Sequence, residues 1–105
     1  MSISFKDTHE SLRHICLTGR LDIAGIDDVS ATFAELSAST TRSVVVDLSE
    51  VTFLVSFAIR ELITNAKLIQ RRGGRMVIFV GGNRAVHKTL ETTGIDTLIP
   101  TFADA

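Results

Sequence analysis

Ser56 is the residue of this chain whose type and position are best suited to chemistry. It follows the β-branched run Val44–Val46 and the apolar step Val51–Val55, and it opens a segment with helical spacing. A hydroxyl at a helix N-terminus lies where backbone N–H groups and the macrodipole favour negative charge. A phosphate there would be tolerated by the fold and would change the surface. Capping is the structural alternative, because serine is a preferred N-cap residue.

The other reactive residue types do not form a recognisable site. His9, His14 and His87 share no metal-binding spacing, and Cys16 does not join them. We expect Cys16 to be a small buried residue within a strand, not a nucleophile. The turn at 81–83 lacks the Lys-Ser/Thr pair of a phosphate-binding loop, so a turn and helix cap is expected there. The sequence therefore predicts a binding protein, not an enzyme, with no catalytic residues, metal or cofactor.

Composition narrows the class of protein further. The chain has 105 residues, of which 45% are hydrophobic and 22% charged, and its formal net charge is −1. These values predict one folded domain spanning residues 1–105, without the charge typical of a nucleic-acid binder. The sequence has no apolar run of 18 residues and no signal-peptide pattern at its start, so we expect a cytoplasmic protein that does not insert into a membrane.

The apolar pattern predicts strands alternating with helices. Asp22 is expected to cap the first helix, and Asp27 and Asp28 fit its acidic first turn better than a divalent cation site. Asn83 is expected to cap the third helix. We expect strands near 3–6 and at 12–18, 44–47 and 76–80. We expect helices from Asp22, at 57–72 and at 84–93. A turn is expected at 7–11, and strand ends are expected at Gly19 and at Ser49-Glu50.

This order predicts an α/β fold with a small mixed sheet. The opening hairpin supplies an antiparallel pair, and right-handed crossovers supply the parallel strands. So few helices are expected to cover one face of the sheet and to leave the other partly exposed, as a potential partner surface. The unbroken valine run also predicts a central strand in which Val45 is almost fully buried.

Several segments, taken in order, carry a family resemblance. They are Gly19–Asp22, Val44–Leu48 and Val51–Ser56, followed by Gly73-Gly74, Met76–Val80 and Thr92–Ile95. Together they resemble the STAS family, which includes the anti-sigma factor antagonists, over nearly the whole chain. The resemblance implies the STAS fold, a small mixed sheet with helices packed mainly on one face.

The resemblance also assigns a role to Ser56. Regulatory STAS proteins carry Asp-Ser-Ser-Gly or Asp-Ser/Thr-x-Gly before the second helix, and a partner kinase that is also the anti-sigma factor phosphorylates the first serine. Ser56 holds that position, but Val55 replaces the acidic residue, Phe57 the following serine and Ala58 the glycine. These departures bear on recognition by a kinase and not on the fold.

The function implied is that of a cytoplasmic bacterial regulator that binds an anti-sigma factor with a kinase-type ATPase fold. Phosphate on Ser56 would block docking. Phe57 is either core or an exposed interface anchor. The expected partner surface consists of the first turn of the second helix, the loop before it and the turn after the second strand: Ser56, Phe57 and Arg60, then Thr52 and Leu54, then Asp22.

An alternative reading is an unphosphorylated STAS scaffold or assembly subunit. Such a protein would be a stressosome-type module or the accessory subunit of a transport complex. Ser56 would then be only a helix cap and Phe57 a permanent contact, and a homo-oligomer is compatible with this reading. A nucleotide-binding or enzymatic protein is a second rival, for which the sequence offers no motif.

Overall fold

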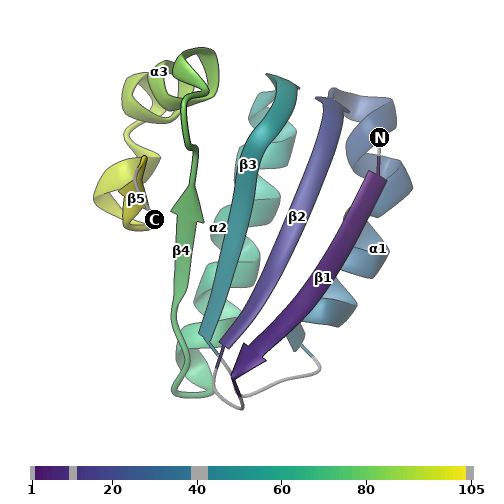
Figure 1. Cartoon of the computed structure of the whole chain (residues 1–105), viewed down its shortest axis with the longest axis vertical. Helices are drawn as coiled ribbons and strands as arrows, with labels where there is room; N and C mark the ends of the chain where they lie inside the picture. The colour runs from purple at the N-terminus through teal and green to yellow at the C-terminus, as the bar shows by residue number, and fades with distance from the viewer. Residues whose placement is uncertain (1, 10–11, 39–42, 104–105) are drawn as a thin grey trace.

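The computed structural model describes residues 2–9, 12–38 and 43–103, which form one five-stranded sheet and three helices. Figure 1 shows α1 and α2 on one side of the sheet and α3 beside the upper end of β4. The elements in chain order are β1 (Ser2–His9), β2 (Leu12–Leu21), α1 (Ile23–Ala38), β3 (Ser43–Leu54), α2 (Ser56–Arg71), β4 (Met76–Phe79), α3 (Arg84–Thr93), a 3₁₀ turn (Ile95–Thr97) and β5 (Thr101–Phe102).

The strands lie side by side in the order of the chain. β1 pairs with β2 antiparallel, and the remaining neighbours pair in parallel. The predicted order of elements, the mixed sheet and the helices on one face are therefore confirmed.

The hydrophobic core lies between the sheet and the helices. Alternate residues of β2 and β3 point toward the helices, which bury Ile15 and Leu17 from β2 together with Val44 and Val46 from β3. The helix α2 contributes one apolar stripe to the same core, made of Ala58, Ile59, Leu62, Ala66 and Ile69. None of the described helices covers the other face of the sheet, called the open face below, and the residues of β2 and β3 that point to it are partly exposed (Figure 1).

The prediction that Val45 is almost fully buried is wrong. Val45 is central in the sheet, since it pairs with His14 on β2 and with Val77 on β4. It is nevertheless half-buried, whereas Val44 and Val46 are fully buried. The valine run suggested a strand covered on both faces, but the helices cover one face, and Val45 points to the other.

The predicted ends of the second and third strands are also wrong, because both strands are longer than expected. β3 continues through Asp47, Ser49 and Glu50 as far as Leu54, and β2 passes Gly19 to end at Leu21. The pairing shifts register between Cys16 and Thr18 and again between Gly19 and Arg20, and Gly19 has φ 96°. Bulges of this kind accommodate polar residues and glycine without ending a strand. β1 likewise runs to His9, and residues 10 and 11 of the predicted turn lie outside the described residues.

The predicted caps of the first and third helices are confirmed. Asp22 Oδ1 accepts a hydrogen bond from Gly25 N at 2.8 Å, and Asn83 Oδ1 accepts one from Val86 N at 3.2 Å. Asn83 Nδ2 also donates to the carbonyl of Val51 at 2.7 Å, which ties the start of α3 to β3. Gly94 ends α3 in the left-handed conformation, and Gly73 with φ 84° follows α2.

Candidate functional site

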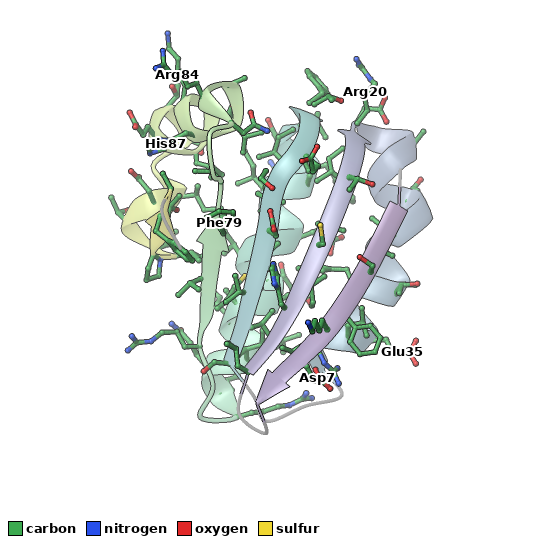
Figure 2. The ribbon with its side chains drawn as sticks, viewed as in Figure 1. Asp7, Arg20, Glu35, Phe79, Arg84 and His87 are labelled. Atoms are coloured by element: carbon green, nitrogen blue, oxygen red, sulfur yellow. The ribbon has the colours of Figure 1, made fainter. Side chains whose placement is uncertain are left out.

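The predicted site residues gather at one end of the sheet, where β2 and β3 stop together. Arg20 pairs with Phe53, Leu21 pairs with Leu54, and Val55 N donates to the Leu21 carbonyl at 3.0 Å. The helices α1 and α2 begin immediately after these strands, at Ile23 and Ser56. Parallel pairing therefore brings the turn at Asp22 and the start of α2 to the same edge, and Figure 2 shows Arg20 at this upper end of β2.

Backbone packing fixes the start of α1 against this edge. A Cβ on Gly25 would lie 2.0 Å from the Arg20 carbonyl oxygen, so the first turn of α1 packs directly on the end of β2. The Asp22 carboxylate accepts from Gly25 N and from Arg20 Nε, the latter at 3.1 Å. These two contacts hold the pKa of Asp22 below its usual value. The Asp22 carboxylate is therefore ionised, and it is already bonded to Gly25 N and to Arg20 Nε.

Ser56 is the first residue of α2, as predicted to within one position, and its side chain is exposed. The N-cap is Val55 in extended conformation (φ −89°, ψ 159°), which makes no side-chain capping bond. Within the part of the chain that the structure describes, the Ser56 hydroxyl has no hydrogen-bond partner. The capping explanation for this serine therefore fails, and its hydroxyl is free to meet solvent or another molecule.

Two exposed phenylalanines lie close to the serine in the sequence, one near the end of β3 and one in the first turn of α2. Phe53 and Phe57 each leave 43% of their area exposed, so Phe57 is not a core residue. The Arg20 guanidinium lies 4.6 Å from the centroid of the Phe53 ring, while Arg20 Nε binds Asp22. The sequence did not indicate Phe53 as a site residue, because it belongs to an apolar segment that is typical of a core. It did not indicate Arg20 either, because only the pairing of β2 with β3 places Arg20 next to Phe53.

Thr52 and Leu54 belong to β3 and not to the predicted loop before α2. Thr52 is exposed, whereas Leu54 is buried (8% exposed) and supports the surface from beneath. A shallow hollow of about 110 Å³ lies between this end of β3 and the helix α3. Its walls are Thr52, Phe53 and Leu54 from the strand, and Ala85, Val86 and Thr89 from α3.

Arg60 completes the group of predicted residues. It lies four residues after Ser56 on α2, so the two side chains leave the same face of the helix one turn apart. Arg60 is exposed and forms no ion pair with any residue described by the structure. A free guanidinium within one turn of an exposed hydroxyl is suited to bind a negative group placed on that hydroxyl.

A second polar group lies on the open face of the sheet. Asp47 Oδ1 accepts from Ser49 N at 2.9 Å and from Ser49 Oγ at 2.6 Å, while Asp47 Oδ2 lies 3.1 Å from His14 Nε2. Burial raises the pKa of Asp47, whereas the hydrogen bonds from Ser49 and His14 lower it. The lowering outweighs the effect of burial, so the pKa of Asp47 lies below its usual value.

Cys16 lies beside this group and is half-exposed, not buried as expected. Burial, Asp47 and Glu50 all raise the pKa of its thiol, which disfavours the reactive thiolate. Among the residues described, no three His, Cys, Asp or Glu side chains come together as a metal site. None of the helices within those residues is long and apolar enough to cross a membrane.

Comparison with known proteins adds to this geometry. The family model for the STAS domain matches residues 6–105 of the chain. This protein belongs to the STAS domain family. No curated protein sequence shows significant similarity to it.

Solved STAS structures share the fold at low sequence identity. An anti-sigma factor antagonist from Mycobacterium paratuberculosis is 20% identical, with a TM-score of 0.85 over 98% of this chain and 86% of that one. An anti-sigma-factor antagonist (STAS) domain protein from Planctomyces limnophilus is 21% identical, with a TM-score of 0.81 over 98% and 91%. The antagonist SpoIIAA in its unphosphorylated form is 13% identical, with a TM-score of 0.76 over 98% and 90%. At these identities the likeness establishes the STAS fold alone.

Proposed function

We propose that this STAS protein is an anti-sigma factor antagonist, a cytoplasmic regulator of bacterial transcription. It binds an anti-sigma factor with a kinase-type ATPase fold and thereby releases a sigma factor. The observation that carries the proposal is the exposed Ser56, which makes no capping bond at the start of α2 and lies near two exposed phenylalanines in the sequence. Ser56 also holds the position of the phosphorylated serine in regulatory members of the family.

The docking face in this proposal consists of Arg20, Thr52, Phe53, Ser56, Phe57 and Arg60. Phe53 and Phe57 supply the apolar contact, because aromatic side chains and arginine dominate the binding energy of protein interfaces. The hollow between β3 and α3 offers room for one apolar side chain of the partner. Asp22 acts within this surface by holding the Arg20 guanidinium in place.

Phosphorylation of Ser56 would switch this surface off. The Ser56 hydroxyl makes no hydrogen bond with any residue that the structure describes, so phosphorylation breaks none of those contacts. The phosphate dianion would lie at a helix N-terminus, where negative charge is favourable, and would not disturb the fold. The phosphate would recruit Arg60, which lies one helical turn away. Docking would then require removing water from a charged group on a surface that otherwise binds through apolar contacts, which disfavours the complex.

The test begins with capture of partners from native lysate by the wild-type protein, with identification by mass spectrometry. A kinase-type ATPase should be recovered, and its affinity should then be measured with purified proteins. We expect Ser56→Asp to weaken binding at least tenfold, equivalent to about 1.4 kcal/mol. Thr32→Asp, which adds the same charge at an exposed position of α1, should bind like the wild type.

Two results would contradict the switch. One is equal affinity of the wild type and Ser56→Asp for the captured ATPase. The other is the absence of phosphate on Ser56 in protein isolated from its own cells, under conditions in which the partner kinase is active.

A scaffold or assembly subunit is the second candidate function. The observation that favours it is Phe57, which is exposed at a place where the regulatory pattern has a small serine, next to Val55 and Ala58 in place of Asp and Gly. In a scaffold, Phe57→Ala breaks a permanent assembly, while Ser56→Asp has little effect. Light scattering of the two variants at matched concentration distinguishes this function from the antagonist.

A further inference from the structure

The open face of the sheet carries a hollow that is separate from the docking face. It has a volume of about 270 Å³ and is lined by His14, Val45, Phe79 and Phe102, from four neighbouring strands. Figure 2 shows Phe79 on β4, on the side of the molecule toward β5. Since an apolar cavity of about 150 Å³ is known to bind benzene, this hollow has room for a substituted or fused aromatic ring.

The apolar lining of the hollow is suited to a flat ring. The Phe79 and Phe102 rings lie 5.3 Å apart between centroids and are tilted by 54°, an arrangement open to a further aromatic contact. Val45 forms the part of the lining on the central strand, and this is the valine that sequence reasoning placed in the core. These three side chains are half-buried, so a bound ring would remove apolar surface from water.

Charged side chains lie near one side of the hollow. His14 lines it, and the nearby carboxylate of Asp47 is already engaged by His14 and by two hydrogen bonds from Ser49. Lys6 pairs directly with His14 across β1 and β2, so it shares this face of the sheet. Arg75 lies two residues before Val77, which pairs with Val45.

Lys6 and Arg75 are both exposed and have no ion-pair partner among the described residues. Lys6 is the strand neighbour of His14 at the rim of this ring-sized apolar hollow, and Arg75 lies just before β4, so this side of the sheet is complementary to a ligand with one aromatic end and one anionic end. We propose that the open face of this sheet binds a small aromatic carboxylate. Its ring lies against Val45, Phe79 and Phe102, and its carboxylate lies beside Lys6, His14 and Arg75.

The test uses 2-naphthoate as the probe. The chain contains no tryptophan or tyrosine, so the fluorescence of the probe is measured without emission from those residues. We expect 2-naphthoate to bind at least tenfold more tightly than 2-naphthalenemethanol, which has the same ring without the charge. Amide shifts in a heteronuclear NMR titration should map to β2, β3, β4 and β5 around the hollow.

Charge-removing variants provide the matched comparison. The double substitution Lys6→Gln with Arg75→Gln should remove the tenfold preference for the carboxylate. The control, Lys67→Gln with Lys88→Gln, removes two exposed charges from α2 and α3 and should keep that preference. Phe102→Ala should weaken both probes at least fivefold, and a thermal melt by circular dichroism checks that this variant folds.

Three outcomes would overturn the proposal. The first is equal affinity for the two probes in the wild type. The second is naphthoate shifts confined to α2 or to the hollow beside α3. The third is a wild-type dimer in light scattering that Phe102→Ser dissociates, because a second copy would then cover this face. The hollow does not include the docking face, so none of these results bears on the antagonist proposal.

Discussion

Ser56 lies where the sequence predicted, at the start of the second helix, but the capping role that its residue type allowed is absent from the fold. The helical spacing after it placed it at a helix start, and α2 begins there. Its preference for the cap position then suggested a structural role. In the fold, the capping position belongs to Val55, one residue earlier, because β3 runs on to Leu54 and the helix starts sooner than the pattern indicates.

This geometry predicts that Ser56 contributes little to stability. We expect Ser56→Ala to change the free energy of unfolding by less than about 0.5 kcal/mol, as for an ordinary exposed substitution. Asn83→Ala is the comparison, because Asn83 accepts from Val86 N and donates to the Val51 carbonyl. It should cost about 0.5–2 kcal/mol. Urea unfolding of both variants measures the difference, and a loss above 1 kcal/mol for Ser56→Ala would restore the capping explanation.

At the scale of elements, local signals predicted helix ends well and strand ends poorly. The capping bonds of Asp22, Asn83 and Gly94 are made with residues no more than four positions away, so these caps can be predicted from the sequence. A strand end depends on the partner strand, and bulges let β2 and β3 continue past Gly19 and Ser49. The exposure of Phe53 follows from those bulges, and for that reason this part of the candidate site could not be predicted.

Asp47 links the bulged part of β3 to the pH dependence of stability. Its pKa is lowered in the folded protein, so its stabilising contribution is present above the unfolded value, about 3.9, and is lost as pH falls through the lower folded value. We expect Asp47→Asn to be less stable than the wild type above pH ~5 and the gap to narrow below pH ~4. Urea unfolding between pH 3 and 6 measures this, and a gap independent of pH would contradict the assignment.

At the scale of the whole molecule, the order of strands and helices determines where a partner can dock. A sheet covered by helices on one face leaves two kinds of accessible surface: the open face, and the edge where parallel strands end and helices begin. The predicted order of elements was sufficient to foresee both. It could not foresee that Arg20, α3 and the end of β3 would meet at that edge, because those contacts join segments more than 30 residues apart.

The last prediction compares two similar pairs at different places in the fold. Phe53 lies under Arg20 at 4.6 Å, and Phe5 lies under Arg13 at 4.8 Å on the edge strand β1. Both rings are exposed, by 43% and 51%, so exposure alone does not distinguish them. Their positions do, because Phe53 adjoins the start of α2 and Phe5 pairs with Ile15 away from it.

If the docking face is correctly assigned, Phe53→Ala should weaken binding of the captured partner at least tenfold, or about 1.4 kcal/mol. Phe5→Ala should bind within twofold of the wild type. Isothermal titration calorimetry with each variant measures the affinities, and urea unfolding confirms that both remain folded. Equal losses from the two substitutions would mean that the partner spans β1 as well. A loss of affinity from Phe5→Ala alone would place the docking face on the edge strand β1, away from Ser56.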